Sequence, residues 1–209
     1  MNNIQIFADK LMCGTWVITY GLVLISTLKM RVPAMAPVSC AVIFPWEFLM
    51  MLNNILGSVH FNYAVMGHLG FALLDFMIIF VILFRLRYYN QKNTIRYFIL
   101  LIAITVLLAL IFQMKRGVLY TSYINTIIGV FIWLIYIAKN DYPFTFLNFT
   151  ILITKLIADV LACITYCDWD NGLFLICLSI FLPLLDVCHI AVFLIEKYRK
   201  SFVWQKKSL

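Results

Sequence analysis

The amino-acid sequence predicts an all-α polytopic membrane protein, a bundle of seven transmembrane helices forming a single domain over residues 1–209. The first observation is composition. Of 209 residues, 65% are hydrophobic and 12% are charged, against about 45–50% and about 25% in an average globular domain. The second observation is segment length, because a helix of about 20 apolar residues crosses about 30 Å of hydrocarbon. The predicted spans are 11–28, 34–58, 65–84, 96–114, 118–138, 144–166 and 173–195.

The first three predicted spans are each recognised by a different feature. The stretch 11–28 is too long for a cleaved signal, and no small-residue cleavage site follows it. The stretch 34–58 contains Pro45, which removes a backbone donor and predicts a kink in the middle of the helix. The stretch 65–84 is apolar apart from Asp75 near its centre. Short loops join these spans and leave no room for a soluble domain.

The last four predicted spans complete the bundle. The stretches 96–114 and 118–138 carry no acidic residue and are separated by a short basic loop. The stretch 144–166 contains charged residues at depth, and 173–195 contains Pro183, which predicts a second kink. No internal repeat, low-complexity tract or linker interrupts them, so one domain is the simplest interpretation.

The basic residues predict the orientation of the bundle, because cytoplasmic loops carry an excess of Lys and Arg. Three basic residues fall on one side, namely Lys10, Lys115 and Arg116. Twelve fall on the other side: Lys29, Arg31, Arg85, Arg87, Lys92, Arg96, Lys139, Lys197, Arg199, Lys200, Lys206 and Lys207. The sequence therefore predicts an N-terminus outside and a C-terminus in the cytoplasm.

The net charge of +7 is thus explained by topology, and no nucleic-acid partner is expected. The six cysteines and three histidines show no recognisable ligand spacing, so we expect neither a metal nor another cofactor. The expected location is the plasma membrane if the chain is bacterial and the endoplasmic reticulum if it is eukaryotic. The lipid bilayer is the expected surrounding of the whole chain.

Five ionisable residues lie near the centres of predicted spans: Glu47, Asp75, Lys155, Asp159 and Asp186. Each costs roughly 2.5–3.5 kcal/mol at that depth on insertion scales, so we expect them to face one another or a cavity. Four acids share one lysine, which leaves three acids with no cationic partner and favours their protonated forms. Such acids suit proton donation to a substrate or proton-coupled transport, and the alternative is a mutually satisfied polar core.

Helical spacing groups some of these residues. Asn148, Lys155, Asp159 and Tyr166 lie on one stripe of the sixth span, and Lys155 and Asp159 can pair at i,i+4. We therefore expect Asp75, Lys155, Asp159 and Asn148 to form a supporting polar site. The proline kinks lie beside Glu47 in the second span and Asp186 in the seventh, as broken helices do at central sites of transporters.

Aromatic residues make up 16% of the chain, and most are expected to anchor helices or face lipid. Trp16 and Tyr20, four residues apart, can instead line a cavity together with Trp46. Aromatic faces stabilise cations, which suits either a carbocation or a transported amine.

Several segments resemble the integral membrane terpene cyclases of fungal meroterpenoid and indole-diterpene pathways. The resemblance lies in the order of Trp16-Val17-Ile18-Thr19-Tyr20, Ala34-Met35-Ala36-Pro37, Pro45-Trp46-Glu47-Phe48, Leu73-Leu74-Asp75 and Leu184-Leu185-Asp186-Val187. The family has a Trp-Glu pair in its second span and a Leu-Leu-Asp-Val segment in its last. The layout of seven spans matches over nearly the whole chain, and the motifs amount to about twenty residues. The chain is similar to a distant, bacterial, member.

The resemblance implies cyclisation of a lipophilic prenylated small molecule, often with a terminal epoxide. It implies that acids at Glu47 and Asp186 start the reaction by protonating the epoxide or a terminal alkene, as general acids do. The chain lacks an Asp-rich diphosphate-binding motif, so ionisation of a prenyl diphosphate is not expected. Two alternatives remain open: a proton-coupled small-solute transporter that uses the same acids, and a non-catalytic membrane scaffold.

Overall fold

A computed structural model describes residues 3–30, 32–57, 63–85, 92–116, 118–139, 142–166 and 172–207. Within these residues it contains seven α-helices and one π-helical turn, which confirms the predicted all-α class. In chain order they are α1 (Asn3–Met30), α2 (Pro37–Gly57), α3 (Tyr63–Phe80), the turn η1 (Val81–Arg85), α4 (Lys92–Arg116), α5 (Val118–Lys139), α6 (Phe146–Tyr166) and α7 (Leu173–Lys207).

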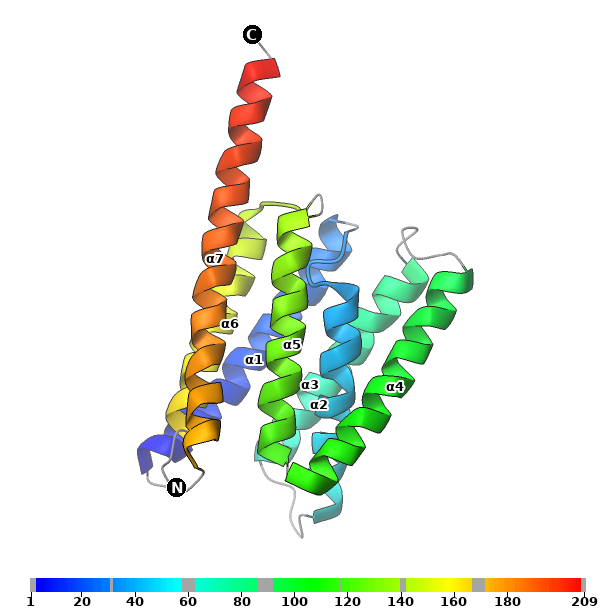
Figure 1. Ribbon diagram of the computed structural model, residues 1–209, viewed down its shortest axis with the longest axis vertical. Coiled ribbons are helices and arrows are strands. Elements are labelled where there is room, and N and C mark those ends of the chain that lie inside the picture. The colour runs from blue at the N-terminus through cyan, green and yellow to red at the C-terminus, as the bar shows by residue number, and fades with distance from the viewer. Residues whose placement is uncertain are drawn as a thin grey trace.

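The helices coincide with the seven apolar stretches, although two extend well beyond them. α1 begins eight residues before the predicted span, and α7 continues twelve residues past it, beyond the other helices at the C-terminal end (Figure 1). α2 begins at Pro37, whose fixed φ and missing N–H suit the first turn of a helix. The basic residues Arg31 and Arg87, used for the orientation, lie outside the described residues.

Six of the helices pack as a closed ring. Around it, α1 contacts α6, α6 contacts α7, α7 contacts α5, α5 contacts α2, α2 contacts α3, and α3 returns to α1. α1 crosses the others obliquely, and α4 lies outside the ring against α2 and α5 (Figure 1). The centre of the ring is therefore enclosed by helices that are far apart in sequence.

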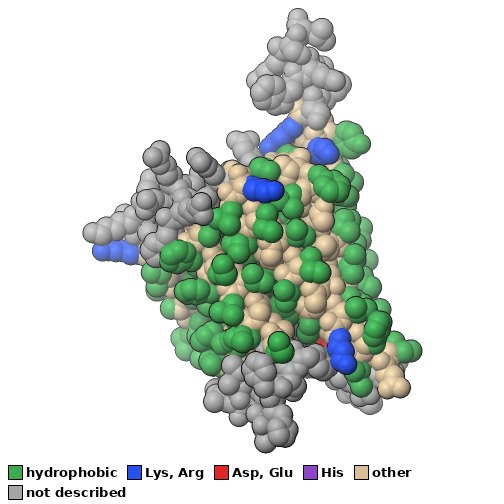
Figure 2. Space-filling view, turned by 180° about the vertical axis from the view of Figure 1, so that it is seen from behind, with side chains coloured by type: hydrophobic (Ala, Val, Ile, Leu, Met, Phe, Trp, Pro, Cys, Tyr) green, Lys and Arg blue, Asp and Glu red, His purple; other side chains and the backbone are tan. Residues whose placement is uncertain are grey.

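The outer surface is strongly apolar. Large hydrophobic side chains are exposed on every helix, for example Leu107 on α4, Phe131 on α5 and Leu184 on α7. Figure 2 shows them over the middle of one face, with Lys and Arg toward its two ends. Three helices in the described residues are long and apolar enough to cross a membrane: Asn3–Met30, Phe146–Tyr166 and Leu173–Lys200. Exposed apolar area on this scale indicates a membrane protein.

The buried connection before α2 is held by side chains from neighbouring segments. Thr27 Oγ1 accepts from the Ala34 backbone N–H at 3.1 Å, and the Tyr142 hydroxyl donates to the Ala34 carbonyl at 2.8 Å. Asn148, at the start of α6, hydrogen bonds with Ser26 of α1 and donates to the Pro143 carbonyl at 2.7 Å. These bonds satisfy buried polar groups and fix α1, α2 and α6 relative to one another.

α2 and α5 approach closely at Gly129. The hydroxyl of Ser39 on α2 donates to the Gly129 carbonyl on α5 at 2.7 Å. A Cβ at Gly129 would lie 2.6 Å from Cδ1 of Ile43, so the missing side chain makes room for this residue. Small residues permit this kind of contact between membrane helices.

Candidate active site

A cavity of about 80 Å³ lies inside the ring of six helices. Six of its thirteen lining residues are aromatic and two are acidic, Glu47 and Asp159. The lining consists of Met12, Trp16, Tyr20, Ile43, Trp46, Glu47, Phe71, Tyr123, Thr126, Asp159, Ala162, Tyr166 and Leu182. Since a water needs about 10–15 Å³ in this measure, the cavity admits several waters or the reactive end of an apolar molecule.

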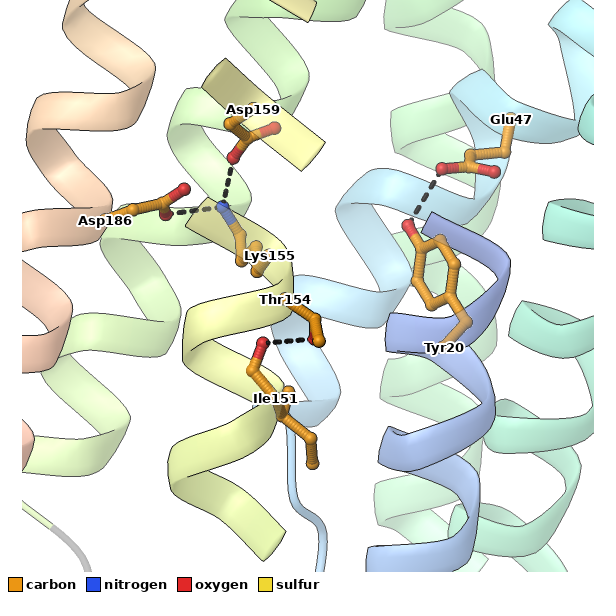
Figure 3. Close-up of polar contacts among 7 residues, drawn as sticks. All are labelled: Tyr20, Glu47, Ile151, Thr154, Lys155, Asp159 and Asp186. Atoms are coloured by element: carbon orange, nitrogen blue, oxygen red, sulfur yellow. Dashed lines mark hydrogen bonds and ion pairs between the residues drawn. The ribbon is translucent and has the colours of Figure 1, made fainter. Parts of the chain in front are cut away.

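Glu47 is held by a tyrosine from the neighbouring helix. The Tyr20 hydroxyl on α1 donates to Glu47 Oε1 on α2 at 2.8 Å (Figure 3). Tyr20 itself stacks on Trp16, with ring centroids 5.4 Å apart. Glu47 is 5% exposed, and no described residue hydrogen bonds to its second oxygen, Oε2. One oxygen of Glu47 is therefore held by Tyr20, and the residue as a whole lines the cavity.

Asp75 lies behind this pair on α3. It is fully buried, and neither of its carboxyl oxygens has a hydrogen-bonding partner among the described residues. Its helix packs against α1 and α2, which carry Tyr20 and Glu47. Asp75 does not line the cavity.

A second polar cluster, made of Lys155, Asp159 and Asp186, lies on the opposite side of the cavity. Lys155 Nζ is 2.6 Å from Asp159 Oδ2 and 2.5 Å from Asp186 Oδ1 (Figure 3). All three side chains are at most 2% exposed. The i,i+4 pair expected within α6 is present, and the aspartate on α7 joins it.

The prediction that three intramembrane acids have no cationic partner is wrong. Lys155 bonds to both Asp159 and Asp186, which leaves two such acids, Glu47 and Asp75, without a cationic partner among the described residues. An ammonium group has three N–H donors and can serve carboxylates from two helices. Helical spacing reveals only the partner on the same helix.

Trp16 connects the two clusters. Its ring stacks on Tyr20, the partner of Glu47, and Lys155 Nζ lies 5.6 Å from the ring centroid. An aromatic face near an ammonium group contributes a favourable cation–π interaction. The same ring is part of the cavity lining.

The structure separates the expected site residues into three groups. Trp16, Tyr20, Trp46, Glu47 and Asp159 line the cavity. Lys155, Asp186 and Asp75 lie outside its lining, and Asn148 is used to tie α1 to α6. The joint role of Glu47 and Asp186 as catalytic acids stays a prediction. The second acid that lines the cavity with Glu47 is Asp159.

Sequence reasoning missed several lining residues. Phe71 and Tyr123 carry no local signal that distinguishes them from other aromatic residues in these spans. Tyr166 belongs to the predicted stripe of α6, and its hydroxyl donates to Asp9 Oδ1 at 3.3 Å.

His189 is fully buried, with its ring edge-on to Trp133 at 5.1 Å between centroids. It packs outside the cavity lining.

In the part of the chain that the structure describes, no group of three or more His, Cys, Asp or Glu side chains is arranged to hold a metal ion. Lys155 fills the space between Asp159 and Asp186. Chemically, the cavity combines carboxyl groups with aromatic walls. Such a site can donate a proton, accept one, and stabilise a cation between the two events.

Comparisons with known proteins add no relative: no protein-family model, no curated protein and no solved structure matches this chain. Function is therefore inferred from the residues and geometry of the cavity.

Proposed function

We propose that the chain is a membrane-embedded terpene cyclase that protonates an epoxide or a terminal alkene of a lipophilic prenylated molecule and thereby starts its cyclisation. The observation that carries this proposal is Glu47, a buried carboxyl group without a cationic partner among the described residues, which lines a cavity together with six aromatic residues. A buried carboxyl group without a cationic partner is most stable uncharged. An uncharged carboxylic acid is a proton donor.

The walls of the cavity suit the intermediate of such a reaction. Trp16, Tyr20, Trp46 and Phe71 surround the space next to Glu47. Their faces attract positive charge, and a site lined by helices limits the access of the bulk water that would quench a carbocation. These properties support a cyclase over a non-catalytic scaffold.

The proposal includes seven membrane crossings, with the N-terminus outside and the C-terminus in the cytoplasm. Support comes from the closed ring of helices, the apolar surface and the excess of basic residues in one set of loops. A bilayer would also concentrate a lipophilic substrate around the helices. The surrounding membrane is the plasma membrane in a bacterium and the endoplasmic reticulum in a eukaryote.

The proposal is tested with the full chain purified into lipid nanodiscs and two probes, farnesyl phenyl ether and its terminal epoxide. Cyclisation is an isomerisation, so a product of unchanged mass and altered retention time is expected from at least one probe. Empty nanodiscs are the control. Lack of conversion of both probes, combined with uptake of solutes into sealed vesicles that a protonophore abolishes, would favour the proton-coupled transporter instead.

A further inference from the structure

The two acids that line the cavity, Glu47 and Asp159, differ in their partners. Glu47 receives a hydrogen bond from Tyr20, and in the described part of the chain no basic side chain forms an ion pair with it. Asp159 is bonded to the ammonium group of Lys155 at 2.6 Å. When two carboxyl groups in one site have different surroundings, one can stay protonated and act as the acid while the other stays ionised and acts as the base.

The charge of the second cluster limits how many protons it carries. Two ionised aspartates and one ammonium would leave a net negative charge at a site that is at most 2% exposed, which is costly in a low-dielectric interior. The cluster is neutral when it holds one proton between Asp159 and Asp186. One aspartate is then a carboxylate and the other a carboxylic acid.

Position in the fold separates the two aspartates. Exposure does not, since both are almost completely buried. Asp159 lines the cavity, where water or a substrate can hydrogen bond to the carboxylate oxygen that Lys155 does not hold. Asp186 lies outside the lining, and its Oδ2 is buried without a hydrogen-bonding partner among the described residues. Negative charge is less costly on the carboxyl group that can accept more hydrogen bonds, so the carboxylate is assigned to Asp159.

We propose that Asp159 is the base that ends the cyclisation, and that Asp186 is a positioning residue acting on Asp159 through Lys155. This inference rests on the proposed cyclase function. Figure 3 shows the free side of the Asp159 carboxylate turned away from Lys155, toward the side on which Glu47 lies. The acid that starts the reaction and the base that ends it thus face one cavity from opposite sides.

The proton balance closes over one cycle. Glu47 gives its carboxyl proton to the epoxide oxygen or to the alkene carbon, and becomes a carboxylate. The resulting carbocation forms ring bonds and then loses a proton to Asp159. The electron pair of the C–H bond that breaks in the cation becomes the product double bond. Substrate and product are isomers. The proton returns from Asp159 to Glu47 through water, for which the emptied cavity has room.

This assignment is tested by product distribution, measured with the same two probes in nanodiscs. Asp159→Asn still permits protonation, so the probe is consumed, but the cation loses its proton elsewhere or adds water. We expect the share of the wild-type isomer to fall by at least about tenfold. Asp186→Asn preserves a hydrogen-bond acceptor for Lys155, so it lowers the rate by about tenfold and leaves the isomer ratio unchanged.

Two further variants keep the test decisive. Asp159→Glu retains the ion pair and moves the carboxylate by one methylene, so it is expected to alter the isomer ratio even where Asp159→Asn does not fold. Cys188→Ala, on α7 and exposed, is the matched control with wild-type rate and products. Melting temperatures in nanodiscs identify variants that fail to fold.

The outcomes are distinguishable. A wild-type isomer ratio in Asp159→Asn and Asp159→Glu, with loss of all consumption in Asp186→Asn, would overturn the assignment and leave the cyclase proposal standing. Failure of the wild-type protein to convert either probe would instead contradict the cyclase proposal itself, and the assignment with it.

Discussion

Replacing Lys155 with methionine probes the charge balance of the buried cluster directly. The substitution preserves most of the side-chain volume but removes the one ammonium group that bonds Asp159 and Asp186 at 2.6 and 2.5 Å. Breaking a buried ion pair by removing one partner costs about 3–5 kcal/mol. We therefore expect Lys155→Met to lower the free energy of unfolding by this amount at pH 7.

The number of protons bound on folding gives a second estimate of the loss in the free energy of unfolding. Without Lys155, both aspartates are neutral in the folded protein, which is one more bound proton than in the wild type. At pH 7 this proton costs about 4 kcal/mol, because an unfolded aspartate ordinarily has a pKa of about 3.9 and each pH unit is about 1.4 kcal/mol.

The pH dependence has a definite sign. The folded variant binds one more proton relative to its unfolded state than the wild type does, so its stability falls more steeply as the pH rises. Lowering the pH from 7 to 5 should therefore recover about 3 kcal/mol of the loss, at about 1.4 kcal/mol per pH unit. The free energy of unfolding is measured at both pH values by titration with sodium dodecyl sulfate in mixed micelles, with tryptophan fluorescence as the signal.

The matched control is the double variant Lys155→Met/Asp159→Asn. It removes one acid together with the cation, so Asp186 alone is neutral and the proton count equals that of the wild type. We expect it to be more stable than Lys155→Met at pH 7 and to share the pH dependence of the wild type. A Lys155→Met protein within about 1 kcal/mol of wild type at both pH values would refute the reasoning, since a buried pair costs about 3–5 kcal/mol to break.

Two other substitutions test the walls of the site. Tyr20→Phe removes the donor to Glu47 Oε1 at 2.8 Å and leaves a buried acceptor unsatisfied, so thermal unfolding should show a loss of about 1–3 kcal/mol. An unchanged melting temperature would mean that this bond is absent in the membrane. Gly129→Ala places a Cβ 2.6 Å from Cδ1 of Ile43, and overpacking should cost about 1–3 kcal/mol. A double-mutant cycle with Ile43→Ala should remove this cost, and strict additivity would contradict the contact.

Much of the secondary structure could be predicted from sequence, because apolar stretches of about 20 residues allow few alternatives to a helix. The pairing of Lys155 with Asp159 was also accessible, since i,i+4 neighbours lie on one face of a helix. Both are local properties. They depend on neighbouring positions in the chain and not on which helix lies opposite.

The composition of the cavity could be predicted only in part. Trp16, Tyr20 and Trp46 were expected to line it, and the structure places them there. Two features depend on α6 packing against both α1 and α7. They are the ion pair between Asp186 and Lys155 and the position of Asp159 on the side of the cavity opposite Glu47. Helical periodicity gives the face on which a residue lies, but not the neighbour of that face. Asn148 shows the same limit: it shares the stripe with Lys155 but serves the junction of α1 and α6.

The dependence of turnover on Glu47 tests the central claim most directly. Glu47→Gln is nearly isosteric and keeps an acceptor for the Tyr20 hydroxyl, but it has no acidic proton to donate. With the probe that the wild type converts, its rate should fall by at least about 100-fold, the usual contribution of a general acid, while its melting temperature stays near that of the wild type. A folded Glu47→Gln protein that cyclises the probe at close to the wild-type rate would contradict the claim that this carboxyl group starts the reaction.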